Sequence, residues 1–165
     1  MIKSIRNFII ERKVQTFATF FVASLLSLST VYFVELVLNY KPCELCLYQR
    51  IPFFVILFVS IFGLFSRYFV KLSKIVIFFG ILANLILSGY HSGIEHGVFA
   101  PLHPCIKSVD VDFSDLSKVP EQMPSCDRPE FYIFGLSMTE WNFIWNLSLM
   151  LVLVMLNLRS KQLQG

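Results

Sequence analysis

Charged residues are scarce in this sequence, and their scarcity excludes several classes of protein. Asp, Glu, Lys and Arg make up 15% of the 165 residues, whereas 56% are hydrophobic and the mean hydropathy is +0.67. A typical soluble domain is about 25% charged. We therefore exclude a soluble domain, a disordered chain and a coiled coil. The net charge of +3 is too small to indicate a nucleic acid as a partner.

Long runs without charge are present instead. A helix needs about 20 apolar residues to cross the hydrocarbon of a bilayer. Four runs approach this length, and Glu35 is the one charged residue within them. The second run is short, so its helix must include residues 46–50, which draws Arg50 to the membrane interface. We predict membrane spans at about residues 14–38, 46–66, 75–94 and 141–158.

The sequence also lacks internal repeats, low-complexity tracts and Gly/Ser-rich linkers. The first 13 residues could be mistaken for the start of a secretion signal, but the apolar run behind them is longer than 20 residues and has no clear small-x-small cleavage site, so we expect a retained helix. The predicted fold is an all-α membrane protein, a single four-transmembrane-helix bundle over residues 1–165 with two outward loops. These loops are expected at about residues 39–46 and 95–140.

The distribution of charge predicts which ends face the cytoplasm. Residues 1–13, 67–74 and 159–165 carry nine Lys or Arg and one acid, whereas the remaining chain carries five bases and ten acids. Basic residues concentrate on the cytoplasmic side of a membrane. We therefore expect both termini in the cytoplasm and both predicted loops outside.

All four cysteines fall at the outer side: Cys43 and Cys46 near the first loop, Cys105 and Cys126 in the second. Thiols outside the plasma membrane tend to be oxidised, so two pairs there indicate disulfides before they indicate zinc ligands. The first pair forms a C-x-x-C motif, whose thiols often have a lowered pKa and exchange rapidly. A helix that begins nearby would also direct its positive N-terminal dipole at Cys46.

Two features leave alternatives open. Arg50 would share a helix face with Cys46, but Pro52 predicts that this helix begins near Tyr48 or is kinked there. The first cysteine pair could also be a structural bridge or half of a zinc site. The second pair could be a static bridge worth about 3 kcal/mol. Two dithiols on one face of a small membrane protein instead indicate that electrons pass from one pair to the other.

The three histidines, His91, His96 and His103, lie at the outer end of the third span or beyond it. A zinc site built from them with Cys105 follows no common ligand spacing, so we predict no metal. His91 is placed to hydrogen-bond a molecule in the outer leaflet, or simply to meet water. Two further polar residues receive no chemical role: Glu35 is expected to cap the first span, and Asn84 to pack between helices.

The arrangement resembles the DsbB family of bacterial inner-membrane disulfide oxidoreductases. Four elements carry the resemblance: KPCELCLYQR before the second span, YHSGIEHG after the third, the second cysteine pair, and GLSMTEW before the fourth span. The resemblance implies an enzyme that reoxidises a periplasmic DsbA-like thiol oxidase and passes the electrons to a membrane quinone, either ubiquinone or menaquinone. It also implies the bacterial inner membrane as location, with periplasmic cysteine loops.

The resemblance also implies roles for individual residues. The pair near the quinone falls on Cys43 and Cys46, and Cys46 is the sulfur expected to attack the quinone. Arg50 matches the arginine that contacts the quinone, and His91 is the nearest match to a histidine found near it. The loop pair falls on two further residues: Cys105, expected to form the mixed disulfide with the partner, and Cys126.

Two other functions fit parts of the pattern. The vitamin K epoxide reductase class also joins a four-helix bundle to cysteine pairs and a quinone, although the segments around KPCELCLYQR and GLSMTEW favour DsbB. A non-catalytic four-span scaffold would use its disulfides only to shape the outer loop. The scaffold predicts bridges that do not turn over.

Overall fold

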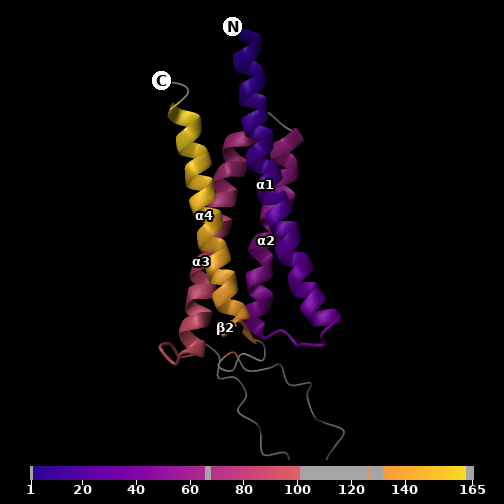
Figure 1. The fold of residues 1–165 in the computed structure, drawn as a ribbon, viewed down its shortest axis with the longest axis vertical. Helices are drawn as coiled ribbons and strands as arrows, with labels where there is room; N and C mark the ends of the chain where they lie inside the picture. Colours follow the sequence, from indigo (N-terminus) through magenta and orange to yellow (C-terminus); the bar gives the residue numbers. More distant parts are fainter. Residues whose placement is uncertain (1, 66–67, 101–125, 127–131, 163–165) are drawn as a thin grey trace, which may run out of the picture.

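Four long helices dominate the computed structural model, which describes residues 2–65, 68–100, 126 and 132–162. The elements are α1 Ile2–Leu36, α2 Glu44–Phe65, α3 Val70–Glu95, the strands β1 Tyr132–Ile133 and β2 Leu136–Ser137, and α4 Met138–Gln162. The helices lie side by side, and both chain termini are at the same end of the bundle (Figure 1). Within the described ranges, all four helices are long and apolar enough to cross a membrane, which confirms the predicted four-helix fold.

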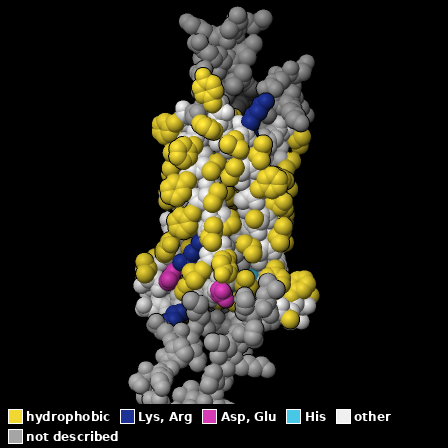
Figure 2. Space-filling model, turned by 180° about the vertical axis from the view of Figure 1, so that it is seen from behind, with side chains coloured by type: hydrophobic (Ala, Val, Ile, Leu, Met, Phe, Trp, Pro, Cys, Tyr) yellow, Lys and Arg dark blue, Asp and Glu magenta, His cyan; other side chains and the backbone are white. Residues whose placement is uncertain are grey.

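The outer surface of the bundle is apolar. Large side chains in mid-helix are exposed, including Phe58 at 57%, Phe62 at 63% and Ile86 at 64%. Apolar side chains cover the middle of the face drawn in Figure 2, and charged ones lie toward its ends. A soluble monomer rarely exposes such an extended apolar surface, whereas lipid tails accept it. The protein is a membrane protein.

The helices pack in chain order, α1 on α2, α2 on α3 and α3 on α4, while α1 and α4 make few contacts. The core between them is built around large fully buried side chains: Phe17, Phe20, Ile56, Ile77, Ile81 and Leu153. Gly63 permits close packing of α1 on α2, because an added Cβ would lie 2.5 Å from the Phe17 ring. Since α1 and α4 barely touch, space is left between them at the end of the bundle opposite the termini.

Helix α2 begins at Glu44, earlier than the start near Tyr48 that Pro52 suggested. Cys43 is its N-cap: the Leu47 amide donates to the Cys43 carbonyl at 3.2 Å, and the Cys46 amide donates to the Cys43 sulfur at 3.3 Å. Pro52 lies inside the helix. Cys46, predicted at the boundary between the first outer loop and the second span, is therefore in the first helical turn, where the N-terminal dipole acts on it.

A tight hairpin leads into α4. Its two central residues, Phe134 and Gly135, have φ of 51° and 80°, the left-handed pair required by a two-residue hairpin turn. The Glu140 carboxylate accepts from the Ser137 amide at 2.7 Å, and the Glu140 amide donates to the Ser137 hydroxyl at 3.2 Å. This reciprocal capping box starts α4 at Met138, ahead of the Trp141 expected from the charge-free run.

Candidate active site

A cavity of about 460 Å³ opens between α1 and α4, at the end of the bundle opposite the termini. Its walls are largely apolar, and they include residues from all four helices. The polar and reactive side chains on its surface include Cys43, Cys46, Cys126, Gln49, Arg50, Glu35, Lys41, His91, Glu95, Thr139 and Asn142. The volume and the few convergent polar groups are typical of a small-molecule site.

Three sulfur atoms meet at the edge of this cavity. Cys43 Sγ lies 2.7 Å from Cys46 Sγ, and the Cys43 side chain is also hydrogen-bonded to Cys126. Cys43 and Cys126 are 6% and 8% exposed and share a small apolar cluster with Ile94. The structure thus brings together one cysteine of the second predicted pair with both cysteines of the first. The remaining cysteine of that pair, Cys105, lies outside the described residues.

The middle sulfur of the three is held as a thiol. A hydrogen bond from Cys126 lowers the pKa of Cys43, but hydrogen bonding to Cys46, burial and the nearby Cys46 charge together outweigh it and raise the pKa to about 12. Cys43 therefore keeps its proton at neutral pH and can donate it toward the Cys46 sulfur. The geometry favours Cys46, at the start of α2, as the sulfur that carries negative charge in the reduced pair.

Arg50 extends from α2 into the same cavity. Its Nη1 lies 2.6 Å from Glu35 Oε2 on α1, and its guanidinium carbon lies 5.1 Å from the centre of the Tyr32 ring. The side chain is 12% exposed, and its Nε is buried without a hydrogen-bond partner among the described residues. Glu35, expected only to cap the first span, is therefore the residue that holds Arg50 in the cavity wall.

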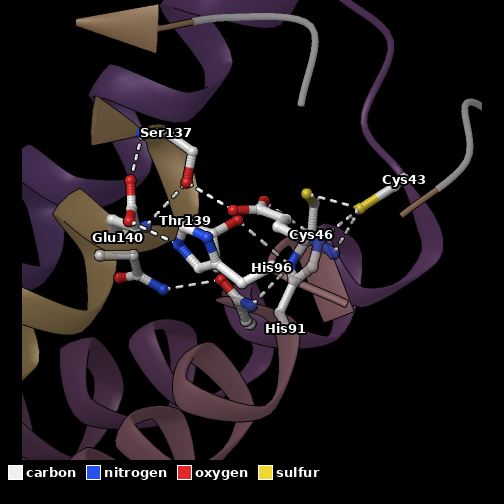
Figure 3. A network of polar contacts seen from close by, with 10 residues as sticks. Cys43, Cys46, His91, His96, Ser137, Thr139 and Glu140 are labelled. Carbon is white, nitrogen blue, oxygen red and sulfur yellow. Dashed lines mark hydrogen bonds and ion pairs between the residues drawn. The ribbon is translucent and has the colours of Figure 1, made fainter. Parts of the chain in front are cut away.

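His91 is buried beside the sulfur atoms, with 2% of its surface exposed. Its Nε2 lies 3.7 Å from Cys43 Sγ, and its Nδ1 is 3.1 Å from Gln49 Nε2 and 3.3 Å from Thr139 Oγ1. Figure 3 shows the ring between the cysteine pair and the start of α4. The fully buried Asn84 packs between helices as predicted, donating to the Gln49 carbonyl at 3.2 Å.

Of the two histidines that the structure describes, only His91 lies at the sulfur atoms. His96 is 63% exposed and contacts Glu140 at 3.0 Å, while His103 lies outside the described residues. Several polar residues of the site were not predicted from the sequence, among them Gln49, Glu95, Thr139 and Asn142. A signal existed for two of them, because Gln49 and Asn142 are amide side chains at the ends of apolar spans, where a polar group needs a protein partner.

Residues 13–156 match the family described as disulfide bond formation protein DsbB. The chain belongs to the DsbB family. It is also similar to an uncharacterised protein of Rickettsia prowazekii (strain Madrid E), RP370, with 34% identity over 136 residues, which is 79% of each chain. The DsbB match confirms the resemblance seen in the sequence and supports a role in disulfide-bond formation at a membrane. It favours this family over the vitamin K epoxide reductase class.

Proposed function

We propose that this DsbB-family protein reoxidises a periplasmic DsbA-like thiol oxidase and passes the electrons to a membrane quinone, ubiquinone or menaquinone. The observation that carries the proposal is the order of the sulfur atoms. Cys43 contacts Cys126 on one side and Cys46 on the other, and Cys46 and Arg50 line the same cavity. In this proposal the whole chain acts as one domain in the bacterial inner membrane, with cytoplasmic termini and periplasmic cysteine loops.

The first half of the reaction is a series of thiol–disulfide exchanges. A thiolate of the partner attacks Cys105, the Cys105–Cys126 bond breaks, and Cys126 leaves as a thiolate. The Cys126 thiolate then attacks Cys43, the Cys43–Cys46 bond breaks, and Cys46 leaves with the electron pair. The contact between Cys126 and Cys43 supports this direction of attack. The start of α2 stabilises the charge on Cys46. The second thiolate of the partner displaces Cys105 from the mixed disulfide, which releases the oxidised partner. The Cys105 thiolate then attacks Cys126, and Cys43 leaves as a thiolate.

The cavity residues fit a quinone. A bound quinone supplies an acceptor for two electrons and two protons. The buried Arg50 Nε lacks a partner among the described residues and suits a quinone oxygen. Fixed positive charge there would stabilise negative charge both on Cys46 and on an oxygen in the cavity. The apolar side chains that α1 and α4 contribute to the cavity wall suit the ring of a quinone and exclude water.

A comparison of reduction potentials explains why an electron acceptor other than cysteine is needed. DsbA has a reduction potential of about −120 mV, whereas an ordinary thioredoxin-like pair has one of about −270 mV. Transfer from DsbA to such a pair would be uphill by about 7 kcal/mol. A quinone that removes the electrons makes the overall transfer favourable.

The test uses the purified full chain in lipid nanodiscs, supplied with a reduced DsbA-like partner and with ubiquinone or menaquinone. We expect quinone reduction, followed by its absorbance, to match the loss of partner thiols mole for mole. The Cys46→Ser variant should reduce no quinone, and its loss of partner thiols should stop within a single turnover, once the Cys105–Cys126 disulfide is consumed. If the quinone stays oxidised while both cysteine pairs remain bridged in excess partner, the disulfides are structural and the proposal is wrong.

A further inference from the structure

Four amide side chains form a buried chain on the side of His91 away from the sulfur atoms. Two of them are anchored on backbone carbonyls: Asn84 Nδ2 donates to the Gln49 carbonyl at 3.2 Å, and Asn146 Nδ2 donates to the Asn142 carbonyl at 2.8 Å. A carbonyl oxygen only accepts hydrogen bonds. These two contacts therefore fix which end of each anchored amide is the nitrogen.

The anchors determine the other two amides. Asn142 Oδ1 accepts from Asn146 Nδ2 at 2.9 Å, and Asn142 Nδ2 faces Asn84 Oδ1 at 3.4 Å. Asn142 Nδ2 must then be the donor to Gln49 Oε1, at 2.7 Å. Since Gln49 Oε1 is used in this contact, Gln49 turns its Nε2 toward Nδ1 of His91, at 3.1 Å.

We propose that this amide chain holds neutral His91 as the tautomer protonated at Nε2, and that this N–H is a hydrogen-bond donor to the Cys43 sulfur. Nδ1 of His91 faces the Gln49 N–H at 3.1 Å and so must accept from it, which excludes a proton there; the Thr139 hydroxyl, 3.3 Å from Nδ1, is then a second donor to it. The proton of the neutral ring is then on Nε2, which lies 3.7 Å from Cys43 Sγ and 3.6 Å from Glu95 Oε1, and the ring is also hydrogen-bonded to the backbone of Cys126. Gln49 and Asn142 are positioning residues, since they act through His91.

The consequence for disulfide exchange rests on the proposed function. When a bond between Cys43 and a second cysteine is opened by attack on the second sulfur, the electron pair goes to Cys43, which leaves as a thiolate. An N–H aimed at that sulfur stabilises the developing charge, because hydrogen bonds to ionised acceptors are the stronger ones. A histidine in the other tautomer would present a lone pair to the thiolate.

The same tautomer disfavours a metal ion at the cysteine pair. Cys43, Cys46 and His91 place their ligand atoms within 4.8 Å of one another, which resembles a Cys₂His set for zinc. A histidine that binds a metal through Nε2 carries its proton on Nδ1 and donates it to an acceptor. Here Nδ1 faces a donor, Gln49 Nε2, so binding requires the amide chain to break.

The direct test is ¹⁵N NMR of the reduced full chain in detergent micelles, labelled at histidine, with His91 assigned from the His91→Asn variant. We expect an unprotonated Nδ1 and a protonated Nε2. In Asn142→Asp, the carboxylate accepts from Gln49, the amide of Gln49 turns over, and the proton should move to Nδ1 of His91. Asn157→Asp, the same change at the other end of α4, should give the same His91 signals as the wild type. A protonated Nδ1 in the wild-type protein would overturn the proposal without any variant.

A second measurement titrates the same reduced proteins with Co²⁺ and follows thiolate-to-cobalt absorption. Asn142→Asp should bind Co²⁺ at least about tenfold more tightly than the wild type, the size of effect expected from a metal's outer-shell partner. Asn157→Asp should bind as the wild type does. Equal affinity in all three proteins would mean that the amide chain does not govern His91. Both measurements omit partner and quinone, so their failure is distinguishable from failure of the proposed function.

Discussion

The Arg50 guanidinium of α2 is held by Glu35 of α1, with 2.6 Å between Nη1 and Oε2. The same guanidinium lies over the ring of Tyr32, one turn earlier on α1. Helix α1 thus positions a positive charge beside the sulfur atom at the start of α2. The two contacts leave Arg50 Nε buried without a hydrogen-bond partner among the described residues, while Arg50 itself lines the cavity, which ties the packing of two helices to the chemistry of the site.

Replacing Arg50 by methionine should weaken quinone binding without harming the fold. Methionine is of similar length and apolar, so the variant should insert at least as well as the wild type. Loss of a charged hydrogen bond costs about 1.5–3 kcal/mol, so we expect KM for quinone to rise about tenfold to a hundredfold. Reoxidation of Cys46 should slow, whereas exchange between Cys105 and the partner should be little affected. Quinone reduction measured against quinone concentration gives these values.

Arg50→Lys provides the matched control, because it keeps the charge but loses the planar group that reaches Glu35 and the cavity together. Activity should be restored only in part. Indistinguishable curves for the wild type and both variants would make Arg50 an interfacial anchor, and the quinone site would then lie elsewhere.

Replacing Glu35 by glutamine should have a milder effect of the same kind. The amide keeps one hydrogen bond to Arg50 but removes the ion pair, so the guanidinium is less fixed. We expect a severalfold rise in KM for quinone with kcat nearly unchanged, measured in the same assay. Glu44→Gln, on the exposed first turn of α2, is the control and should behave as the wild type. A loss in kcat alone would assign Glu35 to proton transfer.

The four-helix fold was predictable because lipid imposes a simple rule, a long apolar run for each span. Helix starts were less predictable, since they depend on capping groups. The Cys43 sulfur and the Ser137–Glu140 box extend α2 and α4 beyond their charge-free runs. Arg50 and Cys46, four residues apart on α2, both line the cavity, and a role for them toward quinone stays a prediction.

The partners of the site residues could not be predicted. Glu35 and Arg50 come from different helices, and so do Gln49 and Asn142. Which polar groups meet depends on the rotation of each helix about its axis, and a nearly uniform apolar sequence leaves that rotation unspecified. Where buried polar groups occur in a membrane, they indicate that a partner exists without identifying it.

Alkylation of Cys43 should show its raised pKa. The value of about 12 lies above the ordinary value of 9.0, so the thiol stays protonated where an ordinary cysteine ionises. In the reduced protein, the initial rate at Cys43 should therefore keep rising about tenfold per pH unit from about pH 7 to about pH 10. Mass spectrometry of the Cys43 peptide measures this rate of alkylation. A plateau above about pH 9 would mean that the fold leaves this thiol unperturbed.

Fusion of a reporter that is active only in the periplasm should give no signal at the C-terminus. The charge bias predicts that residues 1–13, 67–74 and 159–165 are in the cytoplasm, and both termini lie at the same end of the bundle. The same reporter inserted after Asn39, in the connection before α2, should be active and serves as the control. The opposite pattern would leave the cysteines in a reducing compartment and contradict their oxidation.

The Cys105→Ser variant separates the two cysteine pairs. Cys105 is proposed to meet only the partner, whereas Cys43 and Cys46 adjoin the cavity. The variant should lose oxidation of the partner, while quinone still oxidises its Cys43–Cys46 pair to a disulfide. Trapping free thiols with a maleimide of known mass, before and after quinone is added to the reduced protein, distinguishes these states. Cys46→Ser should give the reverse result: a mixed disulfide with the partner accumulates and quinone leaves it unchanged. If Cys105→Ser still oxidised the partner at the wild-type rate, the second pair would be a static bridge, and electrons would have to enter at Cys43 directly.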